Sequence, residues 1–187
     1  NDNTLVVNVP PDQTGRIREH EANAVIALGK RLGIKKGEPL PRNGSFLSLQ
    51  SPAFASSVYE NNELLYGAAL ATDGGMQTRW AAADTTALLT IPLDKDKPFN
   101  KIVIFEYCDT QNGEDGFSNY RTNRIQSYRI EIEKNGQWEA VYVSDEPMGD
   151  CKVIRFPYPY QTSQIRLNVT KASAPPSVYE FNVIYKE

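Results

Sequence analysis

The sequence predicts a mainly β protein, an antiparallel β-sandwich that follows a short strand and one α-helix. Three observations support this prediction. Apolar and polar residues alternate in several short runs after Ser45, turn-forming residues separate these runs, and a helical period is found only near the N-terminus. Short alternating strands joined by turns are typical of antiparallel sandwiches.

The N-terminal part has a different period from the rest of the chain. Residues 4–9 (TLVVNV) are a β-branched run that predicts a buried strand, and the following PPDQTG predicts a loop. From about Arg18 to Leu32 a helix is predicted, because one face collects Ala22, Val25, Ile26, Gly29 and Leu32. A strand and one helix cannot bury both their faces alone. We therefore expect residues 1–33 to form a part of their own, joined by a Gly- and Pro-rich linker at 34–44.

Residues 45–187 carry the predicted sandwich. Asn135-Gly136 lies between two strand runs and predicts a hairpin, because a type I′ turn needs positive φ at both central residues. The alternating positions are Leu89, Ile91 and Leu93; Ile102 and Ile104; Tyr128, Ile130 and Ile132; Ile165, Leu167 and Val169; and Tyr179, Phe181, Val183 and Tyr185.

The composition excludes several classes of function. The 187 residues include 20 Lys and Arg against 23 Asp and Glu, a net charge of -3, so electrostatics favour neither a nucleic-acid nor a membrane partner. No apolar run approaches the roughly 20 residues of a spanning helix, and any export signal would lie upstream of these residues. One histidine, His20, and two cysteines, Cys108 and Cys151, are too few for a His cluster or an all-thiolate zinc site. The cysteines permit one disulfide, although two separate thiols are the simpler expectation.

The loop at 73–80 (DGGMQTRW) is the sharpest local signal. Asp73 and Thr78 offer hard oxygens, and Gly74 and Gly75 allow a tight turn that aims backbone carbonyls at the same point. A calcium ion takes six to eight oxygen ligands, so a second acid from elsewhere would have to complete a site here. The alternative is an acidic glycine turn in which Asp73 caps a backbone amide. The loop alone leaves both interpretations open, whereas Trp80 is expected in the core.

Motifs along the sandwich resemble a known family. The matching runs are 71–80 (ATDGGMQTRW), 99–106 (FNKIVIFE), 124–131 (RIQSYRIE), 136–138 (GQW), 165–167 (IRL) and 177–181 (SVYEF). In this order they resemble the coagulation factor 5/8 type C (discoidin-like) family, which includes carbohydrate-binding module family 32. The resemblance covers about residues 45–187 and implies a jelly-roll sandwich.

The first segment resembles a different protein part. Residues 5–17 (LVVNVPPDQTGRI) look like the last strand and loop of the catalytic barrel of glycoside hydrolase family 29, and the helix from Arg18 looks like its final helix. The chain then resembles the C-terminal part of an α-L-fucosidase, which implies that the barrel is its partner and that a bacterium exports it to the periplasm or the medium. In that family both catalytic carboxylates come from earlier barrel strands, so we expect no hydrolysis from this chain.

The resemblance also implies site residues. A structural calcium ion (Ca2+) would be held by the carbonyls of Leu70 and Gly75 and the side chains of Asp73, Thr78 and Glu180, the last being the second acid. A sugar would bind among loops at one end of the sandwich, where aromatic side chains occur together with polar side chains that can hydrogen-bond to its hydroxyls. The candidate sugar-binding residues are Tyr59, Asn61, Tyr107, Asp109, Phe117, Tyr120 and Arg121.

Two functions remain open from the sequence. The first is a non-catalytic accessory domain of an α-L-fucosidase that binds glycan. The second is a purely structural or protein-interaction domain that binds no sugar. The stretch 107–121 can equally be a solvated loop with its aromatic side chains tucked against the sandwich, and the sandwich has no histidine of the kind that galactose-binding members of the resembled family often use.

Overall fold

The computed structural model describes Val9 and residues 17–31, 46–112 and 119–185. The chain divides into two compact units, Asn1–Arg42 and Asn43–Glu187. In the first unit, helix α1 spans Glu19–Arg31, which confirms the predicted helix to within one residue at each end. Its first turn carries Glu19 and Glu21, as the helix dipole favours. The predicted strand at 4–9 lies outside the described residues except for Val9.

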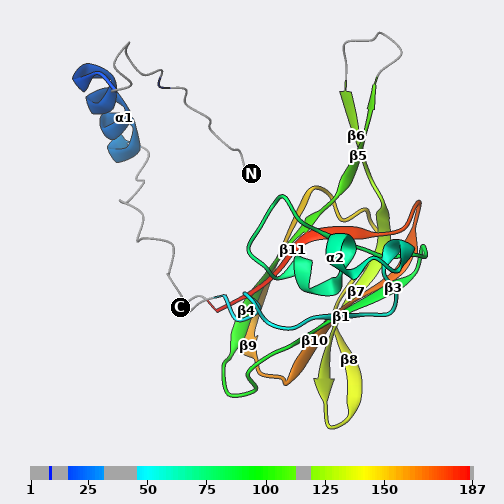
Figure 1. Cartoon of the computed structure of the whole chain (residues 1–187). Coiled ribbons are helices and arrows are strands. Elements are labelled where there is room, and N and C mark those ends of the chain that lie inside the picture. The colour runs from blue at the N-terminus through cyan, green and yellow to red at the C-terminus, as the bar shows by residue number, and fades with distance from the viewer. Residues whose placement is uncertain (1–8, 10–16, 32–45, 113–118, 186–187) are drawn as a thin grey trace. The chain divides into compact units, whose positions relative to one another are not determined.

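The second unit is built from two main sheets and one two-stranded ribbon (Figure 1). Every strand pair among the described residues is antiparallel. The predicted antiparallel jelly-roll β-sandwich is therefore confirmed. The five-stranded sheet runs β1 (Phe54–Ala55), β3 (Ala87–Pro92), β10 (Gln164–Ala172), β7 (Ile125–Lys134) and β8 (Gln137–Ser144). The four-stranded sheet runs β2 (Trp80–Ala81), β11 (Ser177–Ile184), β4 (Phe99–Glu106) and β9 (Cys151–Tyr160), and β5 (Cys108–Asn112) pairs with β6 (Asn119–Asn123).

One apolar core lies between the two main sheets. It forms because side chains alternate between the faces of a strand, so every second residue points inward. The five-stranded sheet contributes Leu89, Ile91, Ile130 and Leu167, and the four-stranded sheet contributes Ile102, Ile104, Phe181 and Val183, all fully buried. Trp80 belongs to the same cluster, as predicted.

Strand β11 departs from the predicted alternation. A bulge shifts its register against β4 between Val178 and Glu180. Val178 is therefore buried in place of Tyr179, which is only partly buried. A bulge re-aims the side chains that follow it, and here it precedes Glu180, which turns toward the loop at 73–78. A local period of two cannot reveal such a shift.

The turn between β7 and β8 is the predicted two-residue hairpin. Lys134 pairs with Gln137, and the two residues between them, Asn135 and Gly136, have φ of 54° and 78°. Both values are positive, as a type I′ turn requires.

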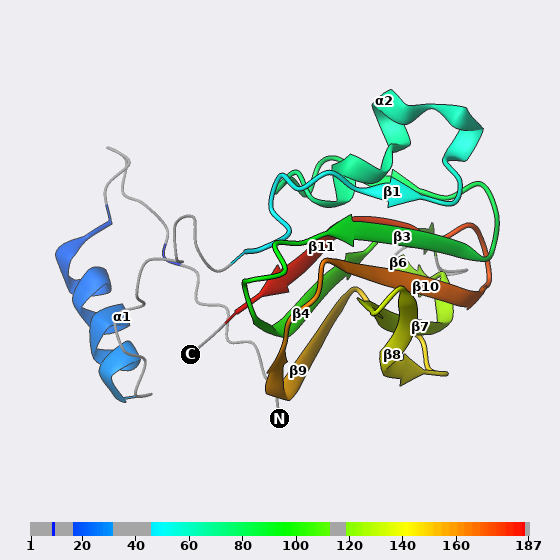
Figure 2. The same ribbon diagram turned by 90° about the horizontal axis from the view of Figure 1, so that it is seen from below.

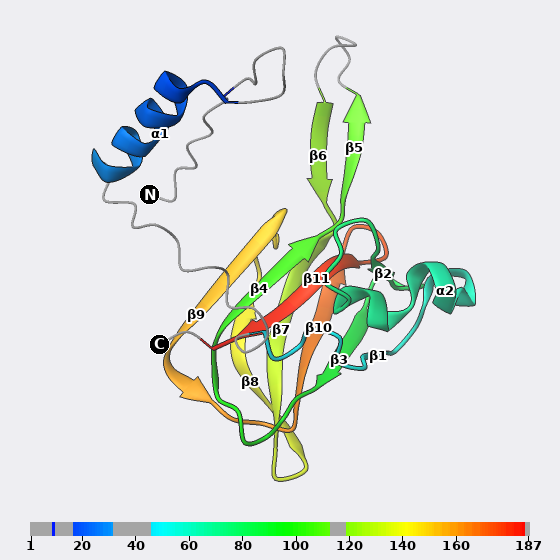
Figure 3. The same cartoon turned by 60° about the vertical axis from the view of Figure 1, so that its left-hand side comes forward.

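Short helical segments occupy 59–71, where no helix was predicted. They are η1 (Tyr59–Asn61), α2 (Glu63–Tyr66) and η2 (Ala68–Ala71). The Asn62 side chain caps α2 by accepting a hydrogen bond from the Leu65 amide. Figures 2 and 3 show α2 beside the β1 edge of the sandwich, and Figures 1 and 3 show the β5–β6 ribbon projecting beyond the sheets. No helix in the described part of the chain has the length and apolar character needed to cross a membrane.

Candidate functional site

Two arginines and a tyrosine meet where several strands end. Arg79 directly precedes β2, Tyr107 joins β4 to β5, and Arg124 joins β6 to β7. The guanidinium carbon of Arg79 lies 4.1 Å from the centroid of the Tyr107 ring, and that of Arg124 lies 4.8 Å from it. Tyr107 therefore holds two cations by contact with its π-system.

A surface pocket of about 380 Å³ opens beside this cluster. Tyr59 and Tyr66 form one part of its wall, with their ring centroids 5.3 Å apart in an edge-to-face arrangement. The Tyr59 side chain is 41% exposed, so its surface is available to a ligand. The lining residues are Tyr59, Tyr66, Arg79, Ala81, Ala82, Arg124, Ala174 and Pro175.

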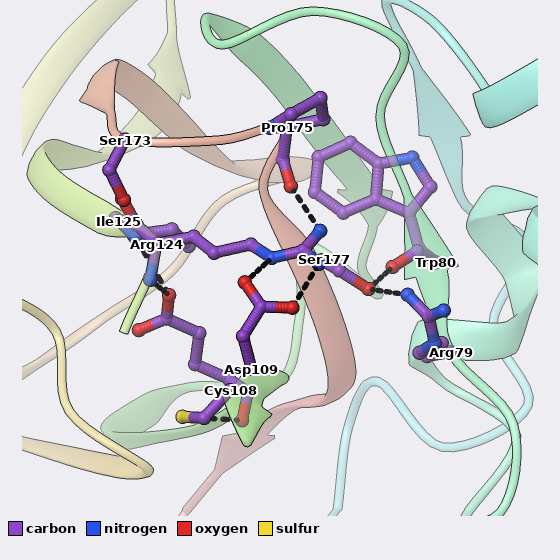
Figure 4. A network of polar contacts seen from close by, with 10 residues as sticks. Arg79, Trp80, Cys108, Asp109, Arg124, Ile125, Ser173, Pro175 and Ser177 are labelled. Carbon is purple, nitrogen blue, oxygen red and sulfur yellow. Dashed lines mark hydrogen bonds and ion pairs between the residues drawn. The ribbon is translucent and has the colours of Figure 1, made fainter. Parts of the chain in front are cut away.

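Arg124 is held in place by three hydrogen bonds (Figure 4). Its Nε and Nη2 donate to the two carboxylate oxygens of Asp109 at 2.8 and 2.5 Å, and its Nη1 donates to the Pro175 carbonyl at 2.9 Å. Hydrogen bonding to Arg124 lowers the pKa of Asp109 and, reciprocally, raises the pKa of Arg124. The two-pronged contact fixes the plane of the guanidinium and offsets its charge.

Arg79 is held differently. Its Nη1 donates to the Ser177 hydroxyl at 2.8 Å, and that hydroxyl donates to the Trp80 carbonyl at 2.6 Å (Figure 4). Its guanidinium also lies 5.1 Å from the Tyr66 ring centroid. Within residues 46–112 and 119–185, the side chain forms no ion pair with a carboxylate. Its charge also attracts the Asp109 carboxylate and contributes to the lowered pKa of that group. Arg79 therefore brings a positioned positive charge to the pocket without a direct ion pair in the part of the chain that the structure describes.

A buried carboxyl group supports Arg124 from inside the protein. Glu106 is 1% exposed, and its Oε1 accepts hydrogen bonds from the amides of Arg124 and Ile125, both at 2.7 Å. Burial raises the pKa of Glu106 to about 7. Next to it, the Cys108 thiol donates to Asp150 at 3.0 Å. Cys108 and Cys151 form no disulfide with each other, as the simpler expectation had it.

A second cluster combines the 73–78 loop with β11. The amides of Gly74 and Gly75 donate to Oε1 of Glu180 at 2.8 and 3.1 Å. Asp73 accepts from the Gly75 amide at 2.8 Å and from the Thr78 hydroxyl at 2.6 Å. Glu180 is 3% exposed, and burial, together with the neighbouring Asp73 carboxyl, raises its pKa to about 7.

This second cluster fits a hard cation in its donor set. Its side-chain donors are oxygens only, and a Cβ at Gly75 would lie 3.0 Å from both Asp73 Oδ1 and Thr78 Oγ1, so glycine leaves that space open. In the described part of the chain no three His, Cys, Asp or Glu side chains gather into a metal-binding group. A cation here would rely on two carboxylates, with carbonyls, the hydroxyl and water completing its shell.

The structure brings together four of the five predicted metal ligands. Asp73, Gly75, Thr78 and Glu180 are joined by the hydrogen bonds given above. Leu70 lies in η2, and no hydrogen bond links it to the other four in the residues that the structure describes. The two carboxyl groups come from positions more than a hundred residues apart, and only the long-range pairing of β11 places them side by side.

The predicted sugar-binding residues divide into three groups. Tyr59 lines the pocket, Tyr107 contacts both pocket arginines, and Asp109 pairs with Arg124. Asn61 is exposed in η1 and does not line the pocket. Phe117 lies outside the described residues, and Tyr120 and Arg121 are in β6, where only the backbone pairing is described.

Of the residues that line the pocket, sequence reasoning named only Tyr59 and missed the other seven, among them Tyr66, Arg79, Arg124 and Pro175. Arg79 and Arg124 each come directly before a strand, β2 or β7, a position that the apolar runs beginning at Trp80 and Ile125 could have indicated. No comparable signal marks Tyr66 or Pro175.

A larger open groove, of about 480 Å³, lies along β3 and β10, beside the residues that follow β1. Its polar lining includes Ser56, Asp84, Arg166 and Asn168, and none of its lining residues is aromatic. It therefore lacks the flat apolar surface that the first pocket has.

Comparisons with known proteins are consistent with this fold. A sequence profile of the F5/8 type C domain matches residues 52–181. A comparison with curated proteins finds no match. Chitosan-binding module 2 of a Paenibacillus sp. IK-5 chitosanase/glucanase, solved with chitotriose, superposes with a TM-score of 0.60 at 21% identity over 75% of this chain and 99% of that module.

Two further solved structures are similar. The family 32 carbohydrate-binding module of C. perfringens NanJ, solved with galactose, has a TM-score of 0.57 at 21% identity over 74% of this chain and 96% of its own. A GH29 fucosidase of Ruminococcus gnavus, solved with fucose, has a TM-score of 0.61 at 20% identity over 98% of this chain. This chain spans only 34% of that fucosidase. At these identities the likeness establishes the fold.

Proposed function

Because the chain belongs to the F5/8 type C domain family, we propose that its sandwich is a non-catalytic carbohydrate-binding domain. The observation that carries the proposal is the pocket in which an exposed ring, Tyr59, lies beside the positioned guanidinium of Arg79. The carbohydrate-binding modules with the same fold, solved with chitotriose and with galactose, support it.

The chemistry of the pocket suits a sugar. A pyranose has one face of C–H groups that packs on an aromatic ring, and hydroxyl groups that accept hydrogen bonds from guanidinium N–H groups. A volume of about 380 Å³ lies within the usual range for small-ligand sites. Because Asp109 and Pro175 hold Arg124, and Ser177 holds Arg79, the donors are oriented before a ligand arrives.

The proposed parent is an α-L-fucosidase of the GH29 type. Fucosidases from Ruminococcus gnavus and Bacteroides thetaiotaomicron share the fold over 98% and 100% of this chain. In α1, Val25 and Ile26 are exposed, with 54% of Ile26 accessible, and a catalytic barrel of the same polypeptide would cover this apolar face. The proposed location is outside the cytoplasm of a bacterium, in the periplasm or secreted.

We also propose a structural calcium ion at the 73–78 loop. Asp73, Thr78 and Glu180 would bind it through side-chain oxygens, and Leu70 and Gly75 through their carbonyls. The bound cation would offset the repulsion of two adjacent carboxylates and tie the loop to β11. The raised pKa of Glu180 supports the proposal, because it reports a buried carboxyl without a cationic partner in the described residues.

A glycan array followed by isothermal titration calorimetry on the whole chain tests sugar binding. Tyr59→Ala is expected to weaken binding of the best glycan about tenfold or more, because the stacking surface is lost. Tyr158→Ala is the matched control, since Tyr158 is an exposed tyrosine of β9 that does not line the pocket. If no glycan binds, the proposed function is wrong.

The alternative is a protein-interaction domain that binds no sugar. Leu64 and Leu65 of α2 favour it, since Leu64 is 85% exposed and Leu65 is also exposed. Under this alternative Leu64→Ser would disrupt a complex with the barrel, measured by size-exclusion chromatography, and the glycan array would be blank.

A further inference from the structure

We propose that the pocket prefers acidic saccharides, and that Arg79 recognises a carboxylate on the sugar. This inference rests on the proposed carbohydrate-binding function and names its ligand class. A neutral sugar would satisfy the aromatic wall of the pocket, but it would leave the charge of Arg79 without a partner.

The charges around the pocket are unbalanced. Its lining residues include two guanidinium groups and no carboxylate. Asp109 pairs with Arg124 through both oxygens and offsets that charge. Glu106 does not face the pocket as a counter-ion, because it is buried and its Oε1 is bonded to the amides of Arg124 and Ile125. Arg79 forms no direct ion pair with Asp109 but also attracts it, so two guanidinium groups share one carboxylate and one positive charge remains in excess.

The two arginines also differ in how many of their N–H groups are already bonded within the protein. Arg124 already uses its Nε, Nη1 and Nη2 within the protein. In the described part of the chain Arg79 uses only Nη1, toward Ser177. Its remaining N–H groups form the kind of planar fork that a carboxylate accepts through two oxygens.

The surroundings of Arg79 prepare it for an anion. Its guanidinium lies against the rings of Tyr107 and Tyr66, at 4.1 and 5.1 Å from their centroids. These rings restrict its movement and displace water from its surface, so a carboxylate would find the donors already oriented. A charge-assisted contact of this kind strengthens binding by about tenfold or more over the uncharged analogue.

Three acid and ester pairs test the inference by isothermal titration calorimetry on the whole chain. The probes are oligogalacturonate, glucuronic acid and N-acetylneuraminic acid, each beside its methyl ester, which keeps the sugar and removes the charge. At least one acid is expected to bind about tenfold or more tightly than its ester, with an affinity that falls as sodium chloride is raised.

Arg79→Gln is expected to reduce that ratio to about one, whereas Arg79→Lys keeps part of it, because lysine retains the charge without the fork. The control is Arg129→Gln, which removes an exposed arginine of β7 outside the pocket. Circular dichroism confirms that each variant is folded.

The outcomes separate the two proposals. If esters or other neutral glycans bind as tightly as the acids, the preference is wrong and the carbohydrate-binding function stands. A preference that survives in Arg79→Gln would refute the role of Arg79. If no acidic or neutral glycan binds, both proposals fail.

Discussion

Glu106 shows how one buried residue ties the core to the pocket. Its carboxyl group accepts hydrogen bonds from the amides of Arg124 and Ile125. It therefore fixes the backbone where β7 begins, directly beside Arg124 of the pocket. Burial raises the pKa of this group from its ordinary value of 4.5 to about 7. Its proton therefore stays on in the folded protein at pH values where an unfolded chain has lost it.

This raised pKa makes stability depend on pH. Between pH 4.5 and 7 the folded state binds the extra proton, so the contribution is complete below pH 4.5 and is lost as the pH rises toward 7. We expect the free energy of unfolding to fall by about 1–3 kcal/mol across this window on account of Glu106. Glu106→Gln should remove that part of the slope in denaturant titrations at several pH values. The exposed Glu146→Gln should leave the slope unchanged, and an equal slope in both variants would contradict the prediction.

At the level of elements, the bulge of β11 builds the proposed cation site. Without the register shift between Val178 and Glu180, the side chain at 180 would keep the alternation of a regular strand. With it, Glu180 reaches the amides of the glycine turn that follows η2. The loop and the strand thus form one unit, which a calcium ion would stabilise by binding only the folded chain.

Removal of calcium by a chelator tests whether an ion stabilises the 73–78 loop and β11. EDTA is expected to lower the melting temperature, and calcium at about a hundred times its Kd to add about 2.7 kcal/mol. The effect should be larger at pH 8 than at pH 5, because Glu180 must lose its proton, with a pKa near 7, before it can bind.

Asp73→Ala and Glu180→Ala should abolish the response to EDTA. The exposed Asp145→Asn should retain it. An identical melting curve of the unmodified chain with and without EDTA would argue against the ion.

The β7–β8 hairpin gives a second prediction for an element. Gly136 has a φ of 78°, and no atom lies within 4 Å of a Cβ placed there. Gly136→Ala would therefore meet no clash, and its cost is the left-handed conformation alone, about 1–2 kcal/mol. Urea denaturation measures it, with Gln137→Ala as the neighbouring control. A loss below a few tenths of a kcal/mol would show that the turn tolerates a side chain.

For the whole molecule, we expect binding without hydrolysis. A retaining glycosidase places two carboxylates about 5 Å apart on either side of the sugar bond. None of the lining residues of the pocket carries a carboxylate. The purified chain is therefore expected to release no nitrophenol from nitrophenyl fucoside above the rate of buffer. Release that one Asp or Glu substitution abolishes would overturn this expectation.

The local pattern of the sequence was sufficient for strands β3, β4, β7 and β10, for β11 after its bulge, and for the hairpin and most of the core. Alternation along a strand and positive φ at Asn135-Gly136 are properties of neighbouring residues, so they can be read directly from the chain. Asp73, Gly75 and Thr78 lie within one loop, so their closeness to one another can also be read from the chain. The short helices at 59–71 were missed because each is too brief to show a period.

What the tertiary structure alone decided is the pocket. Tyr66 is the last residue of α2, whereas Arg79, Tyr107 and Arg124 lie in three different connections. They meet only because the start of β2, the end of β4 and the start of β7 lie close together. The bulge that directs Glu180 depends in the same way on the partner strand. Strand identity follows from interactions between near neighbours, whereas a binding site depends on pairing between distant segments, which leaves no repeat in the sequence.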